Sequence, residues 1–211
     1  YTQLLKDGYP LYSGFSGGLS LLQIVPLDLQ QVEVIKGSSS TLYGGGAIAG
    51  LVNLISKTPG EERELNFMLN ATSALGLDLS GFYADTYGKL GTTVFASYNL
   101  GSPYDPADIG LTAIPEFNRY TINPRVFYEF SENTKLDVGV NTTVEERTGG
   151  NIAYLEGEDV EDPFFERNNT ARTTLQSGFE HSWNDDNRFN LKNSFSFFDR
   201  EIQTGDYIFA G

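Results

Sequence analysis

Residues 40–57 read Ser40-Thr41-Leu42-Tyr43-Gly44-Gly45-Gly46-Ala47-Ile48-Ala49-Gly50-Leu51-Val52-Asn53-Leu54-Ile55-Ser56-Lys57. A glycine-rich turn leads here into a short apolar run with the character of a strand. Glycine permits positive φ angles and close approach of backbones, which a chain needs where it turns tightly among neighbouring strands. A second apolar run, Val32-Glu33-Val34-Ile35, precedes the turn. The two runs together predict a small sheet in the N-terminal part of the chain.

Two catalytic motifs match this part of the chain only loosely. Gly44-x-Gly46-x-x-Ala49 resembles a dinucleotide-binding fingerprint, but that mechanism needs a helix after the glycines, where residues 51–56 predict a strand. Gly14-Phe15-Ser16-Gly17-Gly18 has the spacing of a nucleophile elbow, which needs a buried strand before the serine and a helix after it. The segment offers neither, and His181 lies within an alternating, strand-like region. We therefore expect no catalytic residues and no enzyme.

Composition excludes several other functions. The chain has 28 acidic and 14 basic residues and a formal net charge of -14, whereas nucleic-acid binding needs a basic face. It has no cysteine and a single histidine, so we expect no thiolate metal site and no cofactor. The acidic run at 156–162 lacks the spacing of a calcium loop, and a solvated loop is the simpler interpretation. No apolar run is long enough for a transmembrane helix.

The chain after Pro59 alternates with the period of a strand. In residues 135–144, the apolar side chains at 136, 138, 140 and 144 and Thr142 alternate with polar or small ones at odd positions, and similar alternation recurs in the later segments. The alternation predicts seven strands, several of them longer than those usual in soluble sheets. Their expected ranges are about 62–74, 78–87, 91–101, 119–130, 134–146, 169–183 and 187–203.

The links between these strands differ in length. Those at 87–90, 131–134 and 184–186 are tight, whereas 102–118 and 147–168 are long and rich in Pro, Asp, Glu and Gly. Outer-membrane barrels alternate in this way between short periplasmic turns and long extracellular loops. The short link at 74–76 is the one irregularity. A soluble antiparallel sandwich with uneven loops explains the pattern equally well, so the strands alone do not decide between the two.

Three motifs, in order, resemble the plug of TonB-dependent receptors over most of residues 3–57. Leu4-Leu5-Lys6-Asp7-Gly8-Tyr9-Pro10 is similar to a strand that ends in D-G-x-P. Ile24-Val25-Pro26 and Val32–Gly37 are similar to the family's I-P segment and I-E-V-I-R-G, with Lys36 in the place of Arg. Residues 40–57 are similar to S-x-L-Y-G-x-x-A-x-x-G-x-I-N-I-x-T-K. The plug-motif residues are Asp7, Gly8, Pro10, Glu33, Lys36, Gly37, Tyr43, Gly44, Gly50, Asn53 and Lys57.

The resemblance implies a mostly β fold: a small mixed plug remnant in residues 1–59, then antiparallel up-and-down strands of a partial transmembrane β-barrel in residues 60–211. It also implies a fragment, because neither a TonB box nor a C-terminal aromatic strand is present. The implied function is uptake of a large scarce nutrient, for example a ferric siderophore or other iron complex, across the bacterial outer membrane. The implied partners are TonB, outer-membrane lipid and the nutrient.

The resemblance further implies that the nutrient contacts the apex of the plug and the extracellular loops. The candidate contact residues are Tyr12, Phe15, Tyr104, Asp105, Asp108, Tyr154 and Glu156. A solvated loop surface is the alternative role for any one of them. Glu33, Lys36 and Lys57 are charges that a polar lumen wall could satisfy by pairing. The competing function is that of a soluble all-β binding module at the cell surface.

Overall fold

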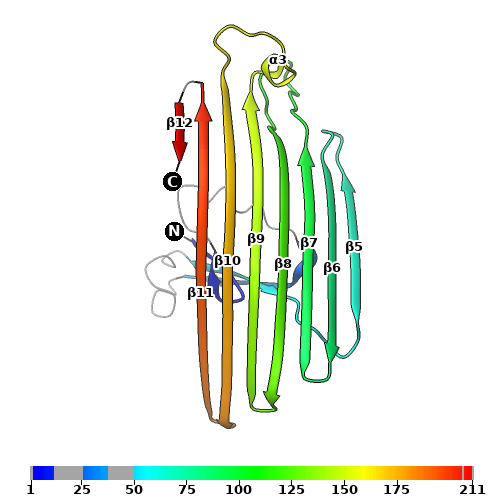
Figure 1. Ribbon diagram of the computed structural model, residues 1–211, viewed down its shortest axis with the longest axis vertical. Coiled ribbons are helices and arrows are strands. Elements are labelled where there is room, and N and C mark those ends of the chain that lie inside the picture. Colours follow the sequence, from blue (N-terminus) through cyan, green and yellow to red (C-terminus); the bar gives the residue numbers. More distant parts are fainter. Residues whose placement is uncertain (1, 12–25, 38–49, 206, 211) are drawn as a thin grey trace.

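The computed structural model describes residues 2–11, 26–37, 50–205 and 207–210, which form two sheets (Figure 1). The smaller sheet has the order β2-β1-β4-β3. It is mixed, because β1 runs parallel to β4 while the other two pairs are antiparallel. Its elements are β1 (Thr2–Lys6), β2 (Tyr9–Pro10), the 3-10 turn η1 (Pro26–Asp28), β3 (Leu29–Lys36) and β4 (Gly50–Ser56). The two apolar runs of the sequence are β3 and β4, as predicted. We call this sheet with η1 the plug sheet.

The larger sheet has eight strands in sequence order, each antiparallel to its neighbours. Its strands are β5 (Glu64–Ala71), β6 (Leu77–Tyr87), β7 (Leu90–Gly101), β8 (Glu116–Ser131), β9 (Thr134–Gly150), β10 (Phe165–Asn184), β11 (Asn187–Thr204) and β12 (Tyr207–Ala210). Among the described residues the sheet is open, since β5 and β12 each have one neighbour. We call it the wall.

The seven predicted strands correspond to β5–β11, so the mostly β fold is confirmed, with two corrections. The short strand β12 was not predicted, because four successive apolar and aromatic residues carry no alternation. The long loops are also shorter than expected, because β9 continues to Gly150 and β10 begins at Phe165. Above Val144 both faces of these strands carry mainly polar side chains. The alternation of apolar and polar residues, on which the strand prediction relied, is therefore absent there.

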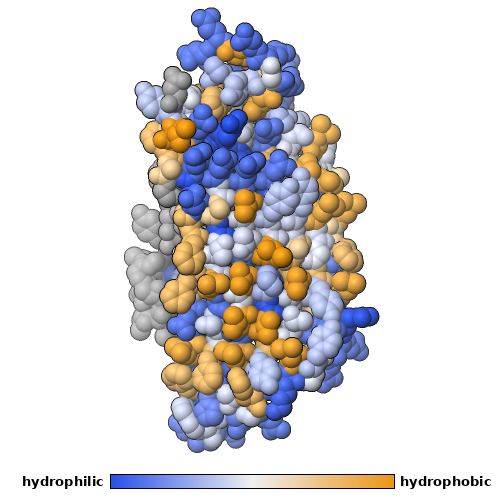
Figure 2. Space-filling model, viewed as in Figure 1, coloured by the Kyte–Doolittle hydropathy of each residue, from blue (hydrophilic) through white to orange (hydrophobic). Residues whose placement is uncertain are grey.

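The two faces of the wall differ in chemistry. The plug sheet lies behind the wall in the view of Figure 1, and Leu27 of η1 packs there against Phe82, Ala84 and Phe95. The opposite face carries a broad band of exposed apolar side chains, orange in Figure 2. Its members include Leu65, Phe67, Leu69, Leu79, Val94, Tyr120, Ile122, Val126, Phe130, Val138, Val144, Leu175, Trp183, Phe189, Leu191, Phe195 and Phe197. We call these the outer face and the plug-facing side the inner face.

Aromatic pairs mark the two limits of the apolar band. The rings of Tyr98 and Tyr120 stack at 4.7 Å near its upper limit, and Tyr128 meets Phe130 edge-on at 4.8 Å near its lower limit. From Tyr120 to Phe130 the strand advances about 33 Å, which a tilt of about 40° reduces to about 25 Å of height. That height is the thickness of the apolar band on outer-membrane barrels.

The two ends of the wall also differ. The tight turns β6–β7, β8–β9 and β10–β11 gather at the lower end in Figure 1, and the longer loops lie at the upper end with the short helix α3 (Ile152–Leu155). The two long loops contact each other: Ile152 N donates to Gly110 O at 2.9 Å, and Thr112 N to Gly150 O at 2.9 Å. No helix in the described part of the chain has the length and apolarity needed to cross a membrane.

Candidate functional site

The β1–β2 turn brings the plug sheet onto the inner face of the wall. Asp7 and Gly8 form it with φ of 55° and 79°, the pair of positive angles that a tight two-residue hairpin turn requires. The Asp7 carboxylate is held within the plug sheet, since Ser56 N donates to its Oδ1 at 2.7 Å. The other oxygen, Oδ2, is thereby directed at the wall.

Two cations of the wall hold this turn. Arg125 of β8 donates from Nη1 to Asp7 Oδ2 at 3.1 Å, and Lys192 of β11 donates from Nζ to the Asp7 carbonyl at 2.8 Å. The Arg125 and Asp7 side chains are 8% and 13% exposed, so their ion pair is largely shielded from water. Asp137 of β9 lies on the far side of Arg125, with Oδ2 at 3.9 Å from Nη2. One guanidinium therefore connects a carboxylate of the plug with a carboxylate of the wall.

A second polar contact lies beside the first. Asp28 of η1 is 2% exposed, and its Oδ2 pairs with Lys6 Nζ at 2.6 Å within the plug sheet. The same oxygen accepts from Asn123 Nδ2 of β8 at 3.2 Å. Asn123 and Arg125 are alternate residues of one strand and so face the plug together. Side-chain hydrogen bonds from β8 thus reach both Asp7 and Asp28.

Tyr9 lies next to the turn and is 4% exposed. Burial raises the pKa of its hydroxyl to about 12, and the nearby Asp137 carboxylate adds to the shift, while Arg125 opposes it. The Lys192 ammonium lies 5.4 Å from the centre of the ring, within the range of a cation–π contact. Tyr9 therefore stays neutral between the charged groups of the contact.

The plug-motif residues serve mainly the internal structure of the plug sheet. Gly8 N donates to Asn53 Oδ1 at 3.0 Å, and Asn53 Nδ2 donates to Glu33 Oε2 at 2.9 Å. Among the described residues, the partners of Glu33 therefore belong to the plug sheet: Asn53 of β4 and Gln31 of β3, whose Nε2 donates to Glu33 Oε1 at 3.0 Å. Gly50 has φ of 140°, and a Cβ there would lie 2.7 Å from Ile35 O.

Three of the remaining motif residues lie at the ends of elements. Pro10 ends β2, Lys36 is exposed at the end of β3, and Gly37 follows with φ of 93°. Lys57 pairs with Glu64 of β5, and so links the plug sheet to the edge of the wall. Tyr43 and Gly44 lie outside the described residues.

The upper end of the wall brings the predicted ligand contacts of both loops to one place. Asp105 organises its own loop, because its carboxylate accepts from Ala107 N at 3.2 Å and from Gly110 N at 2.7 Å. Tyr104 bridges to Ile114, and Asp108 has φ of 53°. In the other loop, Tyr154 stacks on Phe165 at 4.7 Å, and Glu156 caps α3. Tyr12 and Phe15 lie outside the described residues.

Sequence reasoning did not find the wall residues of the polar contact, namely Asn123, Arg125 and Lys192, which bond to the plug, and Asp137, which pairs with Arg125. The alternation places the odd residues of β8 on one face, so the face on which Arg125 lies could be predicted from the sequence. Its partner was not, because Asp7 and Arg125 are 118 positions apart and belong to different sheets. His181 faces outward, where its Nδ1 lies 2.8 Å from Thr134 Oγ1 and its ring meets Trp183 edge-on at 4.9 Å.

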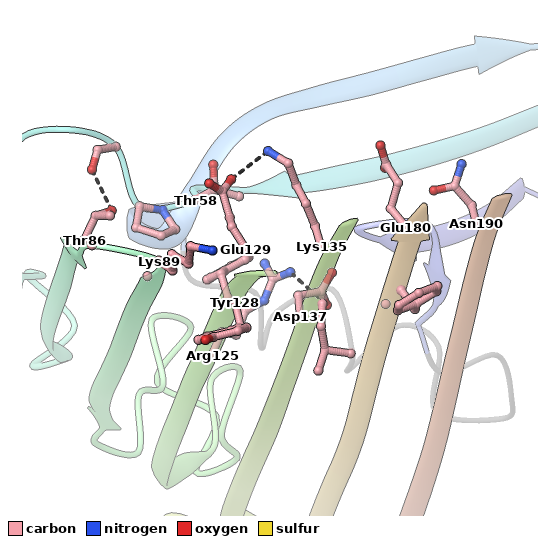
Figure 3. Close-up of a pocket in the computed structure, with 18 of the residues that line it drawn as sticks. Thr58, Thr86, Lys89, Arg125, Tyr128, Glu129, Lys135, Asp137, Glu180 and Asn190 are labelled. Atoms are coloured by element: carbon pink, nitrogen blue, oxygen red, sulfur yellow. Dashed lines mark hydrogen bonds and ion pairs between the residues drawn. The ribbon is translucent and has the colours of Figure 1, made fainter. Parts of the chain in front are cut away.

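Below the plug contact lies a cavity of about 650 Å³ between the inner face and residues 58–61, which lead from the plug sheet to β5. In Figure 3 Arg125 and Asp137 face each other at the side of this cavity, and Lys135 and Glu129 are paired nearby. The Lys135 Nζ to Glu129 Oε1 distance is 2.7 Å. The plug therefore meets the wall through these polar contacts and through the apolar packing of Leu27, and a cavity remains beside them.

A long-stranded sheet with an apolar outer face, and a small mixed sheet docked on its polar inner face, define the class of plugged outer-membrane barrels. Residues 1–51 match the family model described as TonB-dependent Receptor Plug Domain. The Ferrioxamine B receptor of Salmonella typhimurium is 26% identical over 188 residues, covering 81% of this chain. The Ferric aerobactin receptor of Klebsiella pneumoniae is 38% identical over 64 residues, covering 30% of this chain and 9% of that receptor.

Solved structures show the same fold. Pseudomonas aeruginosa FpvA bound to heterologous pyoverdines superposes with a TM-score of 0.76 at 18% identity, over 99% of this chain and 30% of that one. FauA, the alcaligin outer-membrane receptor of Bordetella pertussis, gives 0.74 at 17% identity, over 95% of this chain and 31% of that one. Residues 1–51 thus belong to the plug-domain family of TonB-dependent receptors, and the described chain has the fold of these receptors. It spans 26% of the length of the Ferrioxamine B receptor.

Proposed function

We propose that the full-length protein takes up a ferric siderophore across the bacterial outer membrane, with energy supplied through TonB. Within it, residues 1–59 form the C-terminal half of the plug and residues 60–211 the first barrel strands. The observation that carries the proposal is the docking of the plug sheet on the wall through Asp7 and Asp28. The relatives named as receptors for iron chelates support the ligand class.

The outer face supports a place in the membrane. Phe67 and Leu69 are 78% and 71% exposed, and Phe195 and Phe197 are 65% and 64% exposed. A water-soluble binding module would leave this apolar area in contact with water, whereas a bilayer buries it. The long loops at the upper end then face the outside, and the tight turns face the periplasm.

The chemistry of the contact supports a stopper that can be released. A plug held by an apolar core would resist displacement in proportion to the area buried. A buried ion pair adds little net stability, because desolvation of the two charges offsets most of their attraction. The Arg125–Asp7 pair thus fixes the position of the plug without making its displacement prohibitive. Force applied through TonB then has few contacts to break.

The test is uptake of radioactive iron by a strain whose other siderophore receptors are deleted. Cells with the full-length protein are supplied with a panel of ferric siderophores, and matched cells lack TonB. We expect uptake of at least one chelate that depends on both the protein and TonB. Equal uptake without TonB, or no uptake of any chelate, would contradict the proposal.

A further inference from the structure

Two cations of the wall hold the β1–β2 turn, and a carboxylate of the wall lies beside them. Arg125 Nη1 donates to Asp7 Oδ2 at 3.1 Å, and Lys192 Nζ donates to the Asp7 carbonyl at 2.8 Å. Asp137 lies on the other side of Arg125, with Oδ2 at 3.9 Å from Nη2. That distance is too long for a hydrogen bond, so Arg125 is bonded to the plug while it stays next to Asp137.

Two glycines of the wall provide the space for this arrangement. Arg125 of β8 is the cross-strand neighbour of Gly139 of β9, and a Cβ on this glycine would lie 2.9 Å from Arg125 Cγ. Asp137 is in turn the neighbour of Gly178 of β10, where a Cβ would collide with Asp137 Oδ1. Each of the two side chains therefore lies across the next strand, over a position that has no side chain of its own.

Lys192 lies on the other side of Gly178 from Asp137. The three residues form one row across β9, β10 and β11, with the glycine in the middle. Arg125, Asp137 and Lys192 all line the cavity of about 650 Å³, where Figure 3 shows Arg125 and Asp137 facing each other. The space beside the plug contact thus gives these side chains room to move toward each other.

The charges of these four groups balance only while the plug is docked. With the plug in place, the cations Arg125 and Lys192 face the carboxylates of Asp7 and Asp137. Displacement of the plug removes Asp7 and leaves two cations and one carboxylate on the wall. Arg125 is 8% exposed, and a shielded cation that loses its partner costs free energy. Asp137 is the carboxylate beside this cation and is part of the wall, so it stays when the plug moves.

We propose that Asp137 is a positioning residue for release of the plug: it takes over the guanidinium of Arg125 when Asp7 is withdrawn. In the docked state Asp137 contributes less, since it lies farther from Arg125 and its charge repels that of Asp7. In the displaced state it forms a full ion pair with Arg125. Asp137 thus stabilises the displaced state more than the docked state, and makes the plug easier to withdraw. The proposal rests on the proposed function for its consequence in transport.

The experiment measures hydrogen exchange of the amides of residues 50–56 in the full-length protein and in its variants. We expect Asp137→Asn to slow this exchange about tenfold, because a hydrogen bond between charged groups that forms only in the displaced state is lost. Asp137→Glu keeps the carboxylate and should exchange at the rate of the unmodified protein. Glu129→Gln is the matched control, since Glu129 lines the same cavity but pairs with Lys135, and it should leave exchange unchanged.

A merely supporting role for Asp137 predicts the opposite sign. If Asp137 only held Arg125 in place for Asp7, Asp137→Asn would speed exchange, and either that result or unchanged exchange would overturn the proposal. In the Arg125→Gln background the slowing should be smaller, because only Lys192 then remains for Asp137 to neutralise. A slowing of the same size in that background would also contradict the proposal.

Uptake of radioactive iron separates this proposal from the proposed function. The probes are a ferric trihydroxamate, a ferric tris-catecholate and ferric citrate. For a chelate that the unmodified protein takes up with TonB, Asp137→Asn should lower the maximal rate and leave the half-saturating concentration unchanged, because withdrawal of the plug is affected and binding is not. Slower exchange with an unchanged maximal rate would overturn the role in transport. No TonB-dependent uptake by the unmodified protein would remove the proposed function, while hydrogen exchange would still decide whether Asp137 takes over Arg125.

Discussion

Replacement of Arg125 by glutamine tests the plug contact most directly. The substitution removes the one side chain that lies between Asp7 and Asp137, at 3.1 and 3.9 Å. Asp7 is 13% exposed and, among the described residues, keeps the backbone donor Ser56 N and the neighbouring Lys192, which contacts its carbonyl. Loss of one partner from a buried pair costs about 3–5 kcal/mol. We therefore expect the free energy of local plug opening to fall by about 3 kcal/mol, the lower end of that range, because Lys192 remains close.

The converse substitution, Asp7→Asn, should cost less. Asparagine keeps an oxygen for Ser56 N, and Arg125 retains Asp137 as a carboxylate partner. A loss of about 1.5–2 kcal/mol is expected, from the lower end of the range for one hydrogen bond to a charged group. In the Arg125→Gln background Asp7→Asn should raise the free energy of plug opening instead of lowering it, because it then removes a carboxylate that has lost its cation. The double variant should open less readily than Arg125→Gln alone.

The assay is hydrogen exchange of the amides of residues 50–56 in the full-length protein, since these amides report opening of the plug sheet. A change of 3 kcal/mol corresponds to roughly a hundredfold faster exchange. Arg188→Gln is the control, because Arg188 and Glu180 are 62% and 41% exposed and such a pair contributes at most about 1 kcal/mol. Exchange in Arg125→Gln within threefold (about 0.6 kcal/mol) of the unmodified protein would refute the reasoning, as would strictly additive effects in the double variant.

Three further predictions concern the wall, the turn and pH. Val126→Arg, near the middle of the apolar band, should destabilise the membrane-inserted protein by about 2–4 kcal/mol, whereas Glu146→Arg, at an exposed position above the band, should change it by less than about 1 kcal/mol; urea unfolding in lipid bilayers distinguishes them. Gly8→Ala should lower the stability of the plug sheet by about 1 kcal/mol or more, since φ is 79° and the new Cβ would lie 3.1 Å from Lys192 Nζ. Hydrogen exchange of the plug-sheet amides measures this loss. Exchange unchanged from the unmodified protein would be evidence against the turn geometry. Because the pKa of Tyr9 is raised to about 12, the folded state holds its proton more tightly than the unfolded state, so the stability from this group is present below pH 10 and is lost as pH rises from 10 through 12. Tyr9→Phe should therefore flatten the stability profile in that window, and an unaltered profile would contradict the assignment.

The strands could be predicted because two different solvents surround them. Apolar residues such as Val138 and Leu175 face outward, and residues on the side of the plug face inward. Apolar and polar residues therefore alternate along each strand, which is the pattern that predicts a strand. The prediction failed where that difference ends. Above the apolar band both faces carry mainly polar side chains, and the last residues of β9 and first residues of β10 were taken for loops.

The site was predictable only within one sheet. Asp7 and Gly8 could be named because residues 4–10 resemble the family's strand ending in D-G-x-P, and a D-G pair suits the tight turn that the structure shows. Arg125 and Lys192 could not be assigned as their partners, since the docking of the plug sheet on the wall depends on contacts 118 and 185 positions apart. No local pattern of the sequence records a pairing of that kind.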